Sequence, residues 1–402
     1  MSARWPILLL FLPLMLFCGG KKPAPAPAEF PDWNRSIVNS QSELPKMDAV
    51  VDSFMRFWAL KGVSIAVTRH DSLLYARGYG KADPTTPMTP GTIMRLASVS
   101  KLLTAIGVMR LQEEGKLYLD TPVFGPYGIL KEYDSVIRDD NYYLMTVEHL
   151  LRHQGGFHYR GADVMFTGYH PDPEEFVRQE LRRPLAFTPG TWQQYSNFGY
   201  FLLSLVIEKA SGMPYDEFMQ KEVFEPCGCR GFRIAGNYLK DRLPGESMYF
   251  MQPDSEPVTS FDGKYAGVEK CYGGNDVTSL MGAGAWVGSA VELVRVVSSV
   301  NGLEGIEDIL SADSIQKMTT WYDENTFSLG WVDTKDGEWT RTGSFSGTSA
   351  IVKVFPDGES WVLISNTSAW RGSKFSRNTS YLIKNLRRRF SASLPQRDLF
   401  SE

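Results

Sequence analysis

Ser98 and Lys101 are the residues whose types and spacing most directly suggest chemistry. Residues 98–101 read Ser-Val-Ser-Lys, where a β-rich segment gives way to a helix marked by apolar Leu102 and Ile106. Residues three apart on a helix share a face, so we expect both side chains at the first turn. The lysine charge and the positive helix end would both favour a developing alkoxide. The pair therefore predicts an activated serine hydroxyl.

Two later segments carry polar side chains at the start of a predicted helix or strand. Tyr195-Ser-Asn197 follows a Pro-Gly-Thr turn and leads into an apolar helix, and residues 341–344, Arg-Thr-Gly-Ser, open a late pair of strands. A tyrosine near a lysine ammonium has its charged form favoured and can then accept a proton. Taken singly, the tyrosine fits a buried aromatic, the asparagine a helix cap and Arg341 a surface strand residue. Only their joint occurrence with the serine and lysine indicates a catalytic site.

These three elements, in this order, resemble the superfamily of serine beta-lactamases and penicillin-binding proteins, in its class C-like branch. The flanks resemble the same family at residues 111–117, 150–156, 328–331, 347–350 and 355–358. The resemblance extends from about Met47 to Thr367, which is most of the chain. It implies a beta-lactamase/transpeptidase-like fold and a reaction through an acyl-enzyme.

The resemblance also implies a role for each residue. Ser98 would attack a carbonyl, while Lys101 and Tyr195 manage its proton. The backbone N–H groups of Ser98 and Ser344 would form the oxyanion hole, and losing one such donor costs about 10²–10³ in rate. Substrate would be bound by Asn197, Arg341, Thr342 and Gly343.

Arg341 departs from the family pattern, which usually has lysine or histidine there. Arginine keeps the positive charge and can pair with a carboxylate through two hydrogen bonds, but it is bulkier. Efficient beta-lactam hydrolysis is therefore in doubt. The predicted function is hydrolysis of an ester or amide, with small esters, D-amino-acid peptides and beta-lactams as candidate substrates. The alternative is a non-catalytic binding protein of the cell envelope on the same fold.

The strands and helices expected around these residues indicate an α/β (α+β) fold. One hairpin is expected at Val63–Gly80 and a second at Thr348–Ile364, because β-rich runs flank short polar turns. Helices are expected at residues 102–114 and 201–210, each followed by a glycine. The predicted architecture is an antiparallel sheet formed by both chain ends, flanked by helices, with an inserted, mostly helical lobe. Residues 231–282 are expected to be loops, and the tail after Asn378 a helix covering the sheet.

The N-terminus predicts export. Arg4 precedes an apolar stretch, residues 7–17, that is too short to span a bilayer comfortably and ends at Cys18. We expect a signal peptide at 1–17, lipidation of Cys18, a Pro/Ala-rich tether at 18–45, the hydrolase domain at 46–390 and a tail at 391–402. An ordinary cleaved signal or an uncleaved anchor is the alternative. The expected location is the cell envelope, with the membrane contacted through the lipid anchor.

Composition narrows the partners further. A formal net charge of -4 argues against nucleic acid as a partner. We expect a small-molecule or peptide substrate, and we expect the protein to be a monomer. No metal is expected, because His149 and His153 are four apart but lack the glutamate of the zincin pattern. No cofactor is expected either, and His153 is interpreted as a structural histidine that donates to the backbone. Three thiols, Cys227, Cys229 and Cys271, allow either one disulfide or three small buried residues.

Overall fold

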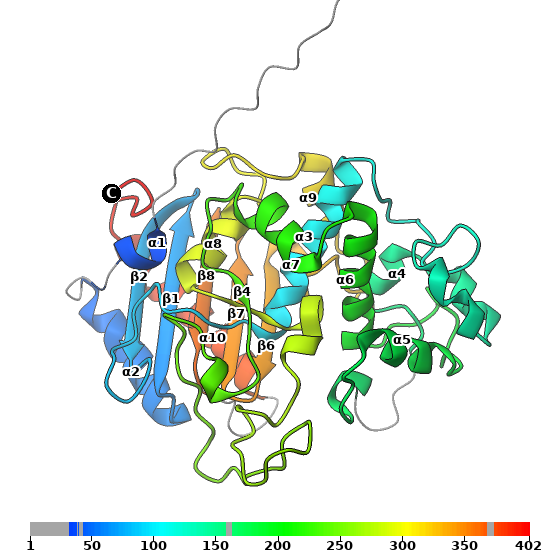
Figure 1. The fold of residues 1–402 in the computed structure, drawn as a ribbon. Coiled ribbons are helices and arrows are strands. Elements are labelled where there is room, and N and C mark those ends of the chain that lie inside the picture. Colours follow the sequence, from blue (N-terminus) through cyan, green and yellow to red (C-terminus); the bar gives the residue numbers. More distant parts are fainter. Residues whose placement is uncertain (1–31, 38, 40–42, 158–162, 368–373) are drawn as a thin grey trace, which may run out of the picture.

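The computed structural model describes residues 32–37, 39, 43–157, 163–367 and 374–402. Among them, five antiparallel strands form the main sheet in the order β2-β1-β8-β7-β6. Their bounds are β1 Gly62–Arg69, β2 Ser72–Gly80, β6 Trp339–Phe345, β7 Thr348–Val354 and β8 Glu359–Ser365. Strands from the two ends of the chain meet where β1 pairs with β8. The predicted sheet formed by both chain ends is therefore confirmed (Figure 1).

Tight turns set the register of both predicted hairpins. Arg69 pairs with Ser72, which leaves only His70 and Asp71 in the first turn. Both turn residues have positive φ, 44° and 66°, as a type I′ turn requires. In the second hairpin, Gly358 has φ 84° just before β8 begins. Turn chemistry therefore fixes which strand residues face each other.

Helices cover both faces of the sheet. Ile65 and Val67 of β1 pack with helices α2 (Pro45–Trp58) and α10 (Lys374–Phe390), whereas Ala66 between them joins the core on the other face. That second face is covered by α8 (Ala290–Ser298), which contacts β1 and β8. Coverage on both sides explains why β7 and β8 are buried at every residue.

The inserted lobe is built around two long helices, α3 (Ser100–Glu113) and α6 (Asn197–Ser211). The shorter helices are α1 Trp33–Ser36, α4 Val147–Leu151, α5 Pro173–Leu181, α7 Tyr215–Met219 and α9 Ala312–Thr319. A second, small sheet joins β3 (Met94–Arg95), β5 (Trp286–Gly288) and β4 (Arg233–Ile234). In Figure 1 the helices α4, α5 and α6 lie to the right of the sheet.

Short helical turns connect these elements. Their bounds are η1 Ala97–Val99, η2 Lys131–Val136, η3 Asp140–Leu144, η4 Val164–Phe166, η5 Gln220–Phe224, η6 Leu239–Asp241, η7 Thr278–Ala283, η8 Lys335–Gly337 and η9 Ser391–Ser393. Two of them, η1 and η7, lie beside the candidate site.

The helix starts lie earlier than the sequence predicted. Helix α6 begins at Asn197 rather than at residue 201, because the Ser196 hydroxyl caps it by accepting the Gly199 N–H at 2.8 Å. The predicted stop is confirmed, since Gly212 closes the helix in the left-handed region at φ 71°. The earlier start places Asn197 inside the first turn of α6.

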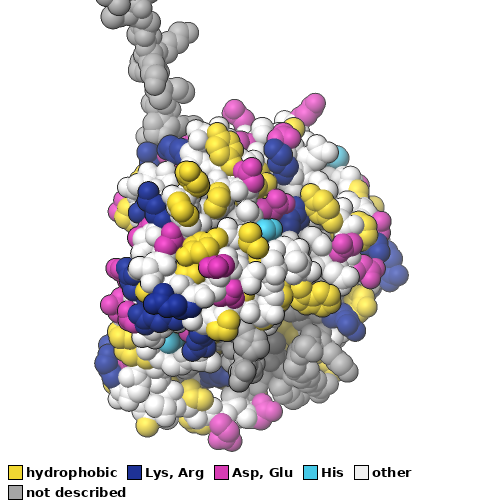
Figure 2. All heavy atoms as spheres, turned by 90° about the vertical axis from the view of Figure 1, so that its right-hand side faces the viewer, with side chains coloured by type: hydrophobic (Ala, Val, Ile, Leu, Met, Phe, Trp, Pro, Cys, Tyr) yellow, Lys and Arg dark blue, Asp and Glu magenta, His cyan; other side chains and the backbone are white. Residues whose placement is uncertain are grey.

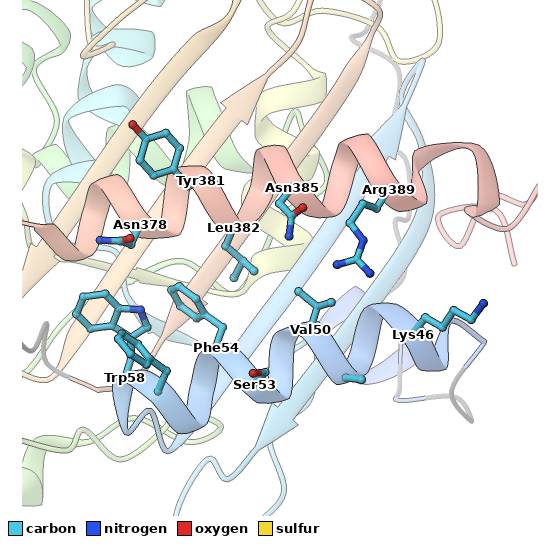
Figure 3. Close-up of a pocket in the computed structure, with 12 residues that line it drawn as sticks. Lys46, Val50, Ser53, Phe54, Trp58, Asn378, Tyr381, Leu382, Asn385 and Arg389 are labelled. Atoms are coloured by element: carbon cyan, nitrogen blue, oxygen red, sulfur yellow. The ribbon is translucent and has the colours of Figure 1, made fainter.

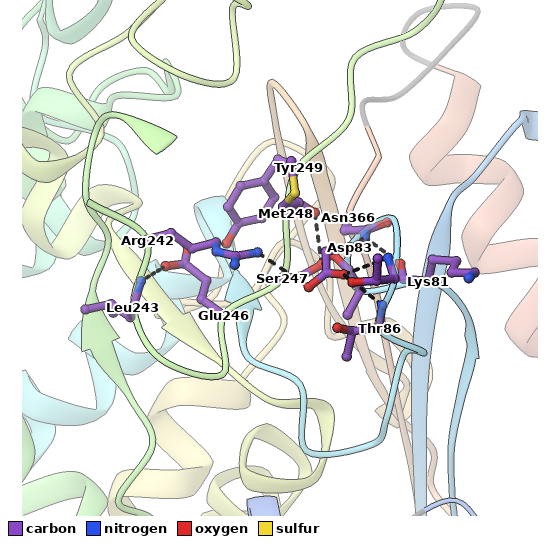
Figure 4. Close-up of polar contacts among 12 residues, drawn as sticks. Lys81, Asp83, Thr86, Arg242, Leu243, Glu246, Ser247, Met248, Tyr249 and Asn366 are labelled. Atoms are coloured by element: carbon purple, nitrogen blue, oxygen red, sulfur yellow. Dashed lines mark hydrogen bonds and ion pairs between the residues drawn. The ribbon is translucent and has the colours of Figure 1, made fainter. Parts of the chain in front are cut away.

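Residues 231–282 are mostly loops, as predicted, and polar contacts hold them in place. Figure 4 shows Ser247 and Asn366 at the centre of one such group. The Ser247 hydroxyl donates to the Ala82 carbonyl at 2.7 Å and accepts from the Asn366 amide at 2.8 Å. Arg242 lies 3.9 Å from Asp83 at the exposed edge of the group. The loops are thereby tied to the turn after β2 and to the residue after β8.

The two ends of the described chain pack against each other. The Trp33 side chain is 2% exposed and its ring contacts Phe400, with centroids 5.2 Å apart. The predicted tether at 18–45 is therefore wrong for residues 32–37, which pack onto the domain. The signal peptide and Cys18 lie outside the described residues. Within the described ranges, no helix is both long and apolar enough to cross a membrane.

Cys227, Cys229 and Cys271 are buried free thiols. The disulfide alternative is thus not adopted, and the three residues pack as small side chains. Burial raises the pKa of the Cys227 and Cys271 thiols to about 12. Such thiols carry almost no thiolate near neutral pH and are poor nucleophiles.

Candidate active site

Ser98 lies at the junction between the small sheet and the central helix. It is the middle residue of η1, which follows β3 and runs directly into α3. The preceding residue, Ala97, has φ 49°, an unfavourable conformation for a side-chain-bearing residue. The Lys101 ammonium donates to the Ser98 hydroxyl at 3.3 Å. The structure therefore brings together the serine and lysine that the three-residue spacing pairs.

Lys101 is fully buried and has an acceptor for each of its three N–H groups. Besides Ser98, its Nζ donates to the Asn197 Oδ1 at 2.7 Å and to the Ala283 carbonyl at 2.5 Å. Burial lowers the pKa of Lys101, and the nearby Arg341 charge lowers it further. The three acceptors favour the charged form, since an ammonium has three donors to satisfy.

Tyr195 lies between two cations. Lys101 Nζ is 4.9 Å from the centre of its ring, and Arg341 Nη2 donates to its hydroxyl at 3.3 Å. Burial raises the pKa of the phenol, but the positive charges of Lys101 and Arg341 outweigh that effect, so the net pKa of Tyr195 is lowered. Its side chain is nevertheless 37% exposed, so the ring borders open space. The arrangement favours a phenolate at the surface of the site.

Arg341 is buried beneath the nucleophile segment. Its side chain is 1% exposed, and Nε donates to the Ser98 carbonyl at 2.7 Å. Its guanidinium contacts the protein at both Ser98 and Tyr195, and the role in substrate binding stays a prediction. In this place its charge lowers the pKa values of both Lys101 and Tyr195.

Strand β6 brings its outer edge to Ser98. It is the edge strand of the sheet, and Thr340 exchanges backbone hydrogen bonds with Asp333 on its outer side. Because backbone groups alternate along an antiparallel strand, Thr342 and Ser344 also present theirs to that side. Gly343 lets the strand approach, since a Cβ there would lie 2.3 Å from the Leu96 carbonyl oxygen. Thr342, Gly343 and Ser344 therefore lie at the edge beside the nucleophile.

The sequence analysis missed two neighbours of the site. Asp163 accepts the backbone N–H of Asn197 at 2.7 Å, and burial raises the pKa of its carboxyl. Ala283, at the end of η7, supplies a carbonyl to Lys101, and Met281 in the same turn has the strained φ of 44°. No local pattern marks either residue, because both reach the site through tertiary packing.

His153 is also part of this region. Its Nδ1 accepts the Ser196 N–H at 3.1 Å, and its ring stacks on Tyr195 with centroids 4.3 Å apart. The interpretation of His153 as a donor to the backbone is corrected, since the ring nitrogen that meets the backbone is an acceptor.

A groove of about 740 Å³ lies elsewhere, between α2 and α10 (Figure 3). Phe54, Trp58 and Leu382 contribute apolar side chains to it. None of the predicted site residues lines this groove. The two helices that form it cover the face of the sheet opposite α8. The size of the groove alone gives it no part in the chemistry at Ser98. Within the described residues, no group of three or more metal-ligating side chains is gathered.

A serine at a helix start, with a lysine one turn on and a tyrosine between two cations, defines the class of the protein as a serine hydrolase. The chain belongs to the Beta-lactamase family, whose model matches residues 47–383. This confirms the resemblance seen in the sequence and the predicted type of enzyme.

Known proteins support the same assignment. The chain is 28% identical over 320 residues to "Esterase EstB" of Burkholderia gladioli, covering 73% of this chain and 79% of the esterase. Its fold matches the D-amino acid amidase of Ochrobactrum anthropi at a TM-score of 0.69 and 19% identity, covering 88% and 99% of the two chains. It also matches an octameric penicillin-binding protein homologue of Pyrococcus abyssi at 0.64 and 24%, covering 86% and 78%. Because that homologue is octameric, a monomer stays a prediction for this chain.

Proposed function

We propose that the protein hydrolyses a small ester, or secondarily an amide, through an acyl-enzyme on Ser98. The observation that carries this proposal is the contact between Lys101 Nζ and the Ser98 hydroxyl, beside a tyrosine whose pKa is lowered by two cations. A serine hydroxyl is a weak nucleophile until an adjacent base takes its proton. The arrangement supplies both that base and a compensating positive charge.

Tyr195 acts as the base in the proposed mechanism. Its phenolate accepts the proton of Ser98 as Oγ bonds to the carbonyl carbon, and it then returns that proton to the departing alcohol or amine. Water attacks the acyl-enzyme in the second half, losing its proton to Tyr195, and Ser98 recovers a proton when the acid leaves. The positive charges of Lys101 and Arg341 stabilise the phenolate each time it forms.

The oxyanion is stabilised in this proposal by two backbone N–H groups, those of Ser98 and Ser344. Gly343 supports this assignment, because a Cβ on it would lie 2.8 Å from the Ser98 nitrogen, so strand and nucleophile segment are in contact. Ser344 follows immediately, and its backbone faces the outer edge by the strand alternation described above. Donors fixed in the backbone need no reorganisation when charge develops.

Arg341 directs the choice of substrate class. A beta-lactam or a peptide with a free C-terminus presents a carboxylate, and a buried guanidinium committed to Ser98 and Tyr195 is a poor partner for it. An uncharged ester needs no such partner. The relative named an esterase fits this preference, so we place esters first, D-amino-acid amides second and beta-lactams last.

The test is a substrate panel on the purified protein and two variants. A p-nitrophenyl ester, D-phenylalanine amide and nitrocefin would be compared at matched concentrations. We expect the ester to have the highest kcat/KM, and Ser98→Ala to abolish its turnover. Ser135→Ala is the matched control, because it removes an exposed hydroxyl on η2, outside the candidate site, so activity should stay close to that of the wild type. Turnover that survives Ser98→Ala, or nitrocefin as the best substrate, would refute the proposal.

We also propose that the protein works in the cell envelope, anchored through a lipid on Cys18. The support is the charged start, the brief apolar stretch and the cysteine that ends it, all in the sequence. Metabolic labelling of the full chain with a clickable fatty acid should mark the wild type and leave Cys18→Ser unlabelled. Equal labelling of both chains, or of neither, would contradict the anchor.

A further inference from the structure

His153 touches Tyr195 and both of its neighbours in the chain. The His153 carbonyl accepts the Gln194 N–H at 2.9 Å, and its Nδ1 accepts the Ser196 N–H at 3.1 Å. Between these two bonds the imidazole stacks on the Tyr195 ring at an interplanar angle of 30°. One residue thus fixes the backbone on each side of Tyr195 and supports its ring.

The histidine itself is held rigidly. It follows α4 with φ 59°, in the left-handed region, where histidine occurs more often than most residues with side chains. Its ring is enclosed by Tyr200 and Phe327 as well as by Tyr195, with centroids 4.9 Å and 5.2 Å away for the first two. Tyr200 in turn donates to the Leu151 carbonyl of α4 at 2.8 Å. Tyr195 therefore stacks on a histidine that is itself tightly packed.

The protonation of this ring follows from its contacts. Because Nδ1 accepts a hydrogen bond, the neutral ring carries its proton on Nε2. Nε2 is buried and has no hydrogen-bond partner in the described structure. Burial lowers the pKa of His153 far below its usual value, and the charges of Lys101 and Arg341 lower it further. A buried donor without a partner destabilises the folded state, so stability alone does not account for a histidine at this position.

We propose that His153 is a positioning residue that holds the Tyr195 phenol at the point where Ser98, Lys101 and Arg341 converge. This inference rests on the proposed function, in which Tyr195 is the base. His153 does not touch the substrate or exchange a proton. Its Nδ1 acceptor and its ring keep Tyr195 in reach of the Ser98 proton, and a misplacement of about 1 Å at such a group can cost about 10²-fold in rate.

The test compares variants that separate the two contacts. His153→Asn places an amide oxygen near the Nδ1 position and tolerates the left-handed backbone, so it keeps the acceptor. His153→Phe keeps a flat ring against Tyr195 but loses the acceptor, and His153→Gln moves the amide towards the Nε2 position. The readout is the second-order rate of Ser98 modification by a fluorophosphonate, measured on the full chain beside a thermal melt of each variant.

We expect His153→Phe and His153→Gln to label about 10²-fold more slowly than wild type, and His153→Asn to recover to within about tenfold. If His153→Phe does not fold, His153→Gln carries the same comparison. Wild-type labelling rates in all folded variants would overturn the inference while leaving the proposed function intact. So would losses that follow melting temperature alone, with no rescue by His153→Asn. A wild type that is not labelled would overturn the proposed function, and this inference with it.

Discussion

The positive charges around Tyr195 lower the pKa of its phenol and so favour loss of its proton. Two buried cations of different kinds face one phenol, and each is fixed by contacts to the backbone as well as to Tyr195. As a side-chain type, arginine stays charged in proteins, whereas a buried lysine readily changes its pKa. The guanidinium of Arg341 therefore keeps a positive charge beside the phenol that we propose as the base.

Removal of that charge should move the pH profile in a defined direction. Arg341 lowers the pKa of Tyr195, so Arg341→Gln should raise it, and the phenolate should then form only at higher pH. The acid limb of kcat/KM for an ester should shift upwards, by about one pH unit for a change of about 1.4 kcal/mol. Arg341→Lys retains a charge and should shift the limb less. An unchanged acid limb in a folded Arg341→Gln protein would contradict this role.

At the residue scale, motif spacing predicted which side chains meet but not how each is used. Ser98 and Lys101 are neighbours on one helix start, which local geometry alone dictates. Arg341 could not be placed from sequence, because its burial depends on how closely β6 approaches η1. His153 presents the same difficulty, since its acceptor role depends on a contact with Ser196 formed across the fold.

At the scale of elements, the site depends on one close approach between β6 and the nucleophile segment. A Cβ on Gly343 would lie 2.3 Å from the Leu96 carbonyl and 2.8 Å from the Ser98 and Val99 nitrogens, all of them backbone atoms. Backbone cannot move aside as a flexible side chain can. The glycine therefore sets the distance between the sheet edge and α3.

Gly343→Ala should both destabilise the protein and slow it. Overpacking of this kind costs about 1–3 kcal/mol, and the shift of β6 would displace the Ser344 N–H from the oxyanion. Gly199→Ala in α6 is the matched control, because the nearest atom to its Cβ would lie at an ordinary 3.4 Å and alanine favours helix. Urea unfolding and ester kinetics would measure both effects. If the two variants behave alike, the close approach has no special importance.

The elements themselves were predictable where pattern and turn chemistry agree. Both hairpins follow from short polar turns between β-rich runs, and the glycines after α3 and α6 mark their ends. The start of α6 was missed because a serine cap only becomes visible once its bond to Gly199 is known. Residues 231–282 lack periodicity because contacts such as that of Asn366 with Ser247 hold them, instead of repeated burial of one face.

At the scale of the whole molecule, the two ends of the chain complete the fold. The sheet unites strands from both ends, and α1 packs beside the C-terminal residues through Trp33 and Phe400. The face in Figure 2 carries basic and acidic side chains interspersed, as befits a net charge of -4 without a dominant basic patch. The composition of the N-terminal segment suggested a tether, but residues 32–37 pack onto the domain because Trp33 and Ile37 are buried among polar neighbours.

Truncation of the N-terminal segment tests whether residues 32–37 stabilise the domain. A chain beginning at Glu43 loses the burial of Trp33 and the two hydrogen bonds of Asn39, which reach the Met88 carbonyl and the Gly78 N–H. It should unfold at lower temperature than a chain beginning at Asp32, by an amount that corresponds to about 3–5 kcal/mol. Trp33→Ala in the longer chain should reproduce most of the loss. Equal melting temperatures for the two chains would show that this segment does not stabilise the domain.

The most direct measurement of the central claim is covalent labelling of Ser98. The purified protein and its Ser98→Ala variant would be treated with a fluorophosphonate probe, and their intact masses compared. We expect a single adduct on the wild type and none on the variant, because Lys101 and Tyr195 activate only that hydroxyl. An unlabelled wild type, under conditions that modify a known serine hydrolase, would contradict the claim and favour a binding protein on the same fold.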